Sequence, residues 1–223
     1  MIGTVIVIAP HPDDETLGCG GTLLRHKAEG DSIHWVIVTD MKEGKDFSKS
    51  RVKARELEIS NVAKDFNFDT VTRLGFSPSG LDLVPLSEII CKISKFFESV
   101  RPETVYLPFP GDAHSDHRKT FEAASACCKN FRHPSIKKVI ACEIPSETEF
   151  GLDPEEGAFR PMLLVDISIY LDHKIRIMKN YAGEMGAFPF PRSEESIRAL
   201  ASYRGSQAGC AAAEAFMILR EIR

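Results

Sequence analysis

Short apolar runs alternate with amphipathic segments through the first half of the chain. Runs rich in β-branched residues, which are typical of buried strands, cover Thr4 to Ala9, Ser32 to Thr39, Thr70 to Leu74 and Thr104 to Leu107. Apolar residues at helical spacing predict helices over Thr16 to Ala28, Lys49 to Asp65 and Leu86 to Ser99. This alternation predicts an α/β fold of right-handed βαβ units, in which a Rossmann-like, mostly parallel sheet has helices on both faces.

The second half of the chain has a less regular pattern. It predicts a helix through Cys128, a strand over Lys138 to Cys142, a polar loop over Ile144 to Pro161, a strand over Met162 to Val165 and a helix over Tyr170 to Tyr181. The apolar run Ala213 to Leu219 fits a strand or a helix, and we favour an antiparallel strand near the C-terminus. The segment Gly183 to Pro191 fits a flexible lid or a packed surface turn. No repeat or linker divides the chain, which predicts one domain over residues 1–223.

Composition and charge narrow the classes of partner. The 28 Lys and Arg residues nearly balance the 32 Asp and Glu residues, so a net charge of −4 provides no basic field for nucleic acid. The longest apolar stretches fall short of the roughly 20 residues of a membrane helix, and no basic region followed by an apolar one opens the chain. The six cysteines form no C-x-x-C pair and are expected to be reduced. We therefore expect a cytoplasmic protein without membrane insertion, and a homo-oligomer is one of the states that the sequence allows.

The loop after the first strand concentrates histidine and carboxylate side chains. His11-Pro12-Asp13-Asp14-Glu15 follows this strand directly, and a glycine-rich segment continues into the first helix. The segment does not match the dinucleotide fingerprint G-x-G-x-x-G, because Leu23 occupies the place of the third glycine. Three adjacent carboxylates would repel a phosphate unless a cation lay between them. One imidazole beside these carboxylates therefore indicates a metal site.

A second cluster, Pro108 to Arg118, follows the strand Thr104 to Leu107 and contains His114, Asp116 and His117. If the strand order is 3-2-1-4-5, the two strands that precede the clusters are neighbours and their connections leave on opposite sides. Both clusters then meet at the topological switch point. Two histidines and one aspartate with an open fourth position fit a catalytic zinc site. The alternative is that His11 and Asp13 to Glu15 only cap a helix, and that His114 and His117 are ordinary surface residues.

The two clusters resemble the signature motifs of the LmbE-like, or PIG-L, family of zinc-dependent N-deacetylases. The resemblance covers nearly the whole chain. Weaker similarities lie at Arg55-Glu56-Leu57-Glu58, Arg101-Pro102, Glu143-Ile144-Pro145, Asp166, Arg204-Gly205 and Glu214-Ala215-Phe216.

The resemblance implies that His11, Asp14 and His117 hold zinc, with other divalent transition metals as alternatives, and that Asp13 is the general base. It also implies that His114 donates to the oxyanion, that Asp116 orients a histidine and that Glu15 supports the site from behind. Asp13 is not needed to hold a metal, so its presence favours an enzyme.

The predicted activity is hydrolysis of an N-acyl group, most simply acetyl, from a small-molecule amino sugar or sugar conjugate. Arg55, Asp40 and Glu143 are the predicted substrate-binding residues, because charged side chains suit a hydroxyl-rich substrate. The chain departs from the family at its glycine-poor segment Thr39 to Asp46, at Ser77-Pro78-Ser79-Gly80 and at Ala182-Gly183-Glu184. Because these segments face the substrate, an amidase for thiol-sugar conjugates, an esterase for acylated sugars and a non-catalytic zinc-dependent sugar-binding protein remain alternatives.

Overall fold

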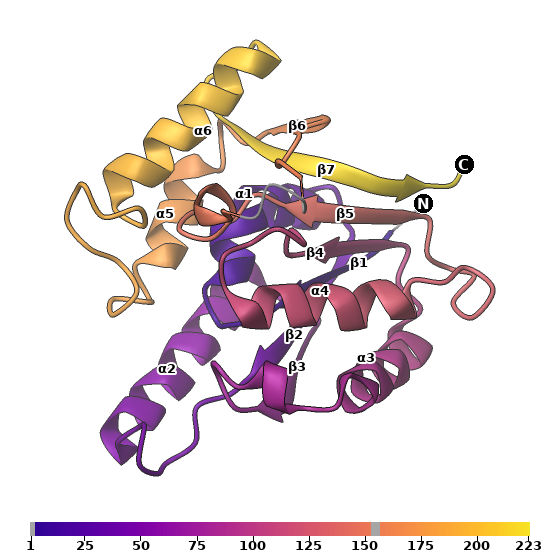
Figure 1. Ribbon diagram of the computed structural model, residues 1–223. Helices are drawn as coiled ribbons and strands as arrows, with labels where there is room; N and C mark the ends of the chain where they lie inside the picture. The colour runs from indigo at the N-terminus through magenta and orange to yellow at the C-terminus, as the bar shows by residue number, and fades with distance from the viewer. Residues whose placement is uncertain (1–2, 153–156) are drawn as a thin grey trace.

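One seven-stranded sheet with the order β3-β2-β1-β4-β5-β7-β6 organises the molecule. The computed structural model describes residues 3–152 and 157–223. Five strands are parallel: β1 (Thr4–Ala9), β2 (Ser32–Thr39), β3 (Thr70–Phe76), β4 (Thr104–Leu107) and β5 (Lys138–Cys142). This order contains the 3-2-1-4-5 arrangement that the switch-point argument assumed, and it places β1 beside β4 (Figure 1).

Helices cover both faces of the parallel part of the sheet (Figure 1). One layer contains α1 (Asp14–Ala28), α2 (Lys49–Phe66) and α5 (Leu171–Met178). The opposite layer contains α3 (Leu86–Val100) and α4 (Ser115–Cys127). The alternation of side chains along β1 divides the core, because Val5, Val7 and Ala9 join the first layer whereas Ile6 and Ile8 join the second.

The C-terminal part of the sheet is antiparallel, as the apolar run from Ala213 suggested. Strand β7 (Ala213–Glu221) runs antiparallel to both β5 and the edge strand β6 (Leu163–Asp166). Two short 3-10 helices, η1 (Leu81–Leu83) and η2 (Thr148–Phe150), lie in the connections. The predicted polar loop from Ile144 contains η2, and its residues 153–156 lie outside the described part of the chain.

Helix α6 (Glu194–Ala208) was not predicted from the sequence, and α5 ends three residues earlier than the predicted Tyr181. The apolar pattern of α6 is weak, since its buried positions are Ile197, Ala201 and Gly205. Its ends carry a clearer signal. The Ser193 hydroxyl accepts the Ser196 N–H at the start, and Gly209 takes the left-handed conformation at the end.

A break in helix α1 explains its glycine-rich segment. Cys19 has non-helical dihedrals, and a Cβ at Gly21 would lie only 2.7 Å from Ile167. The Glu214 carboxylate accepts the Gly21 and Thr22 N–H groups at 2.8 and 2.7 Å, and Lys174 Nζ donates to the Leu17 carbonyl at 2.8 Å. Lys174 and Glu214 also pair with each other at 2.7 Å. The glycines therefore serve close packing, and a buried ion pair satisfies the backbone groups that the break exposes.

Across residues 3–152 and 157–223, no helix is both long and apolar enough to cross a bilayer.

Candidate active site

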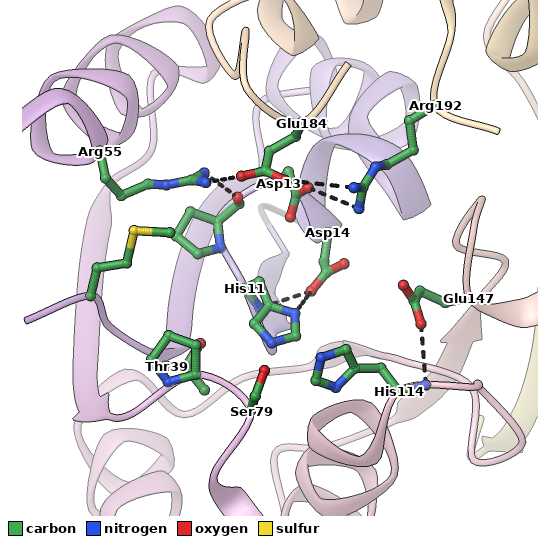
Figure 2. A pocket seen from close by; sticks show the side chains of 13 residues that line it. His11, Asp13, Asp14, Thr39, Arg55, Ser79, His114, Glu147, Glu184 and Arg192 are labelled. Carbon is green, nitrogen blue, oxygen red and sulfur yellow. Dashed lines mark hydrogen bonds and ion pairs between the residues drawn. The ribbon is translucent and has the colours of Figure 1, made fainter. Parts of the chain in front are cut away.

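The loops after β1 and β4 meet at the carboxyl edge of the sheet, as the switch-point argument predicted. They enclose a cavity of about 320 Å³ (Figure 2). The cavity is lined by side chains from both halves of the chain: His11, Pro12, Asp13, Asp14, Thr39, Met41, Arg55, Pro78, Ser79, His114, Glu147, Glu184 and Arg192.

The backbone of Asp13 adopts φ 138° and ψ −28°, a conformation that non-glycine residues rarely take. Several contacts hold it there. The Asp13 carbonyl accepts the Thr16 and Leu17 N–H groups, and Glu15 Oε2 accepts the Asp13 N–H at 3.1 Å. Asp14 Oδ2 accepts the His11 N–H at 2.8 Å. This strained turn directs the adjacent carboxylates of Asp13 and Asp14 to different places in the cavity (Figure 2).

The side chains of His11, Asp14 and His117 form a compact donor set. Asp14 Oδ2 lies 3.3 Å from His11 Nδ1 and 3.3 Å from His117 Nε2. One ligand atom from each residue falls within 4.8 Å of the other two. The structure thus brings together the three residues predicted as metal ligands. Neutral imidazole nitrogens and a carboxylate oxygen are donors that suit zinc and related divalent metals.

Further carboxylates orient the two histidines from behind. Asp116 Oδ2 lies 3.0 Å from His11 Nε2, and this carboxylate also accepts the Ser79 and Leu81 N–H groups at 2.6 and 3.1 Å. Asp112 Oδ2 lies 2.9 Å from His117 Nδ1. Each contact fixes the ring nitrogen that faces away from Asp14, so the other nitrogen is directed at the shared space. Sequence reasoning expected Asp116 to orient a histidine but assigned no role to Asp112.

The electrostatics of the donor set favour a positive charge at its centre. Burial alone would lower the pKa of His11, but hydrogen bonds with Asp116 and Asp14 raise it to about 9. Burial opposes ionisation of Asp14, yet the His117 charge and the hydrogen bonds of both histidines hold its pKa well below the usual range. Burial, followed by the nearby charges of Asp14 and Glu184, raises the pKa of Asp13. Asp13 is thus the carboxylate of the turn that takes up a proton readily.

His114 lies beside this set, with its ring centroid 4.7 Å from that of His11. Its Nδ1 accepts the Asp116 N–H at 3.0 Å and so caps helix α4. Burial, followed by the His11 charge, lowers the pKa of His114. The imidazole is therefore neutral near pH 7 with its proton on Nε2, which makes it a hydrogen-bond donor. The backbone N–H of His114 donates to Glu147 Oε2 at 3.2 Å, so the ring Nε2 proton is not used by this contact (Figure 2).

The residues predicted to bind substrate lie in three different environments. Arg55 reaches the cavity wall, but its side chain is only 4% exposed and contacts the Pro12 carbonyl, Glu58 and Glu184. Asp40 is paired with Arg73, and its side chain is not among those lining the cavity. Glu143 is paired with Arg204 and lines a separate small pocket. Asp40 and Glu143 thus each have an arginine partner, and neither is among the residues that line the cavity.

Three charged residues of the cavity were not predicted, namely Glu147, Glu184 and Arg192. The sequence left a lid or a packed turn as the alternatives for the segment Gly183 to Pro191. Within it, Glu184 contacts Arg51 and Arg55 of α2, so the segment is packed at this point. The departure from the family motif at Ala182-Gly183-Glu184 was the available signal for Glu184. Nothing in the local sequence marks Arg192 as a cavity residue. Its position in the cavity, near Asp13, depends on how distant elements pack together.

The sequence matches a family model. The PIG-L model, described as GlcNAc-PI de-N-acetylase, matches residues 6–128. The chain is also similar to the diacetylchitobiose deacetylase of Thermococcus kodakarensis, with 26% identity over 226 residues that cover 92% of this chain and 79% of the relative.

Solved structures share the complete fold. The conserved protein TT1542 from Thermus thermophilus has a TM-score of 0.78 and 28% identity, covering 100% of this chain and 97% of that one. GalB, the 4-carboxy-2-hydroxymuconate hydratase from Pseudomonas putida, has a TM-score of 0.75 at 18% identity, covering 100% of this chain and 98% of that one. At this identity the likeness to GalB shows the fold alone, so function has to be argued from the site.

Proposed function

Because the chain belongs to the PIG-L family, we propose that it hydrolyses the N-acetyl group of an N-acetylglucosamine conjugate. The observation that carries the proposal is the position of Asp13, a second carboxylate in the cavity beside the His11, Asp14 and His117 donor set. A binding site for a metal alone does not need this residue, whereas hydrolysis needs a base. The family description and the Thermococcus relative both name N-acetylated glucosamine compounds.

The residues fit a divalent metal. Two imidazole nitrogens and one carboxylate oxygen converge, and Asp112 and Asp116 fix the orientation of both rings. Cysteine is absent from the set, as in open catalytic sites of the His and carboxylate type. We propose zinc as the metal, held by His11, Asp14 and His117. When bound, such an ion acts as a Lewis acid and lowers the pKa of water to about 7.

The remaining chemistry belongs to side chains of this chain. Asp13 takes a proton from the attacking water as the carbon–oxygen bond forms and returns it to the amine nitrogen as the carbon–nitrogen bond breaks. The products are acetate and a free amine. His114 donates its Nε2 proton in a hydrogen bond to the carbonyl oxygen, where negative charge develops. Glu15, buried behind the turn, keeps Asp13 in place through the backbone N–H of Asp13.

A screen of N-acetylated sugars tests the proposal. The purified protein, supplied with zinc, is incubated with N-acetylglucosamine, diacetylchitobiose and N-acetylglucosamine glycosides, and released acetate and free amine are both measured. We expect stoichiometric release of acetate and amine from at least one member of the set. Activity only on O-acetylated sugars would identify the esterase alternative, and a thiol-sugar amide in the same screen tests the amidase alternative.

Binding of the sugars without turnover would identify the non-catalytic alternative instead. Hydratase activity is assayed as a control, because the hydratase GalB has the same fold. The cytoplasmic location predicted from the sequence is a further part of the proposal, and a homo-oligomer stays one of the states that the sequence allows.

A further inference from the structure

Arg55, the arginine predicted to bind the substrate, has little capacity left for it. Nη1 of Arg55 donates to the Pro12 carbonyl at 2.8 Å and Nη2 contacts Glu184, while Nε, which makes no hydrogen bond, is buried 3.2 Å from Glu58 Oε2. Pro12, which supplies this carbonyl, directly precedes Asp13. Arg55 therefore stabilises the strained turn at Asp13.

Arg192 also lines the cavity, and its donors are free by comparison. Within the described residues its guanidinium makes no hydrogen bond, and its buried Nε has no partner. Nη1 lies 3.8 Å from Asp13 Oδ2 and Nη2 lies 3.6 Å from Glu184 Oε2, both beyond hydrogen-bond distance. The side chain is nevertheless held in place. Its guanidinium carbon lies 5.3 Å from the Phe190 ring centroid, and the next residue, Ser193, is fully buried and caps α6.

Glu184 offers an acceptor next to these donors. Its Oε1 contacts both Arg51 and Arg55 of α2, which anchors the carboxylate. Among the contacts of the described residues, Oε2 has only the 3.6 Å approach of Arg192. An anchored acceptor and an anchored donor thus face the cavity side by side (Figure 2).

We propose that Arg192 and Glu184 recognise the hydroxyl groups next to the acetamido group of the sugar. A hydroxyl both donates and accepts, so a pair of neighbouring hydroxyls can accept from Arg192 and donate to Glu184. This specificity rests on the proposed function, because Asp13 marks the place of the scissile amide. Arg192 Nη1 lies 3.8 Å from Asp13 Oδ2, so the group it meets is the ring hydroxyl nearest to the amide. In a glycoside of a 2-acetamido sugar this is the 3-hydroxyl, on the carbon next to the amide-bearing carbon, because the other neighbouring carbon carries the glycosidic oxygen.

The local charge favours a neutral hydroxyl over an anionic group at this position. The Arg192 guanidinium faces two carboxylates, those of Asp13 and Glu184, and Glu184 is already shared with Arg51 and Arg55. A phosphate or carboxylate of the substrate would meet both carboxylates at close range. A sugar diol meets a donor and an acceptor instead.

The experiment compares the methyl glycoside of N-acetylglucosamine with its 3-deoxy analogue. We expect wild-type protein to prefer the 3-hydroxyl compound by about 10–100-fold in kcat/KM, the range for a hydrogen bond to a charged group. Arg192→Met should lose this preference, so that its kcat/KM values for the hydroxylated and 3-deoxy compounds agree within about threefold. Arg192→Lys keeps the charge but loses the planar fork and should show an intermediate preference.

Arg198→Met is the matched control. Arg198 lies on α6 outside the cavity and pairs with Asp172 and Glu194, so this variant should keep the wild-type preference. Equal slowing of both substrates by Arg192→Met, or no slowing of either, would overturn the inference. Melting temperatures of all variants check that the fold is retained.

A binding measurement separates this inference from the proposed function. Methyl glucosaminide, the deacetylated product, cannot be turned over, and its affinity is measured by calorimetry against the 3-deoxy form. Tighter binding of the 3-hydroxyl form by about tenfold in wild type but not in Arg192→Met supports the inference even if no acetate is released in the screen. Equal binding of both forms by wild type would overturn it.

Discussion

At the scale of residues, the adjacent carboxylates Asp13 and Asp14 have different surroundings. Asp14 lies between His11 and His117, whereas Asp13 faces the cavity with Arg192 and Glu184 nearby. The positive φ of Asp13 separates the two side chains. The hydrogen bond of Glu15 to the Asp13 N–H and the Arg55 contact with the Pro12 carbonyl stabilise this strained conformation.

Replacing each carboxylate should therefore have a different consequence. Asp13→Asn should keep the metal but lower kcat by about 10²–10⁴-fold, because an amide cannot accept the proton. Asp14→Ala and His117→Ala should lose the metal itself. Metal content per chain and acetate release are measured for each purified variant. Equal metal loss in all three would show that the roles have been assigned wrongly.

The orienting carboxylates act at the same scale. Asp116→Asn or Asp112→Asn should weaken metal affinity by about 10–100-fold, because a neutral amide replaces the carboxylate that orients the facing histidine and raises its basicity. Competition with a chromophoric chelator measures this affinity. Asp82→Asn serves as the control, since Asp82 accepts the Ser115 hydroxyl at 3.2 Å and lies outside the donor set. An unchanged affinity in both Asp112 and Asp116 variants would contradict the prediction.

At the scale of elements, helix α1 depends on groups that come from the distant α5 and β7. Lys174 and Glu214 satisfy the backbone around the break at Cys19, and both side chains are almost completely buried. A buried charge without a partner of opposite sign is strongly destabilising. The pair also ties the helix that begins with Asp14 to the C-terminal part of the fold.

Removing one partner of this pair should destabilise the protein. Lys174→Met leaves the Glu214 charge buried without its cation and should lower the free energy of unfolding by about 3–5 kcal/mol. Urea denaturation followed by circular dichroism measures the change. Lys179→Met provides the comparison, because Lys179 is mostly exposed and its pair with Glu194 should contribute no more than about 1 kcal/mol. Similar losses from the two substitutions would argue against a special role for the buried pair.

At the scale of the whole molecule, the site exists because two distant loops meet. Asp14 comes from the connection after β1 and His117 from that after β4, and these strands are neighbours in the sheet. A metal held by both loops would tie the two halves of the parallel sheet together. Metal binding would then stabilise the folded state in proportion to the logarithm of the free metal concentration once that concentration exceeds Kd.

Removal of the metal should accordingly lower both activity and thermal stability. Chelation from a free concentration about 100 times Kd should lower the free energy of unfolding by about 2.7 kcal/mol and Tm by about 5–10 °C. Adding zinc should restore both. Differential scanning calorimetry measures Tm, and Asp14→Ala, which lacks a ligand, should show no shift with chelator. A wild-type Tm that is indifferent to chelation would contradict a metal bound between the loops.

The sequence alone was sufficient to predict the parallel strands and the loops that carry His11 and His117, whereas the strand order was an assumption of the switch-point argument that the structure bears out. Burial on both faces leaves a strong apolar signal in each strand, and the switch-point rule then places the loops together. Helix α6 was missed because its contact face contains small residues such as Ala201 and Gly205.

Tertiary structure decided how the charged side chains pair. Asp40 and Glu143 were predicted as substrate ligands, but each has an arginine partner in the folded chain. Nη1 and Nη2 of Arg55 are occupied by the Pro12 carbonyl and by Glu184, which lies 129 positions away along the chain, whereas Nη1 and Nη2 of Arg192 make no hydrogen bond within the described residues. Hydrophobic periodicity is a local property that each segment carries by itself. The partner of a charge depends on which distant elements approach it, and only the folded chain determines that.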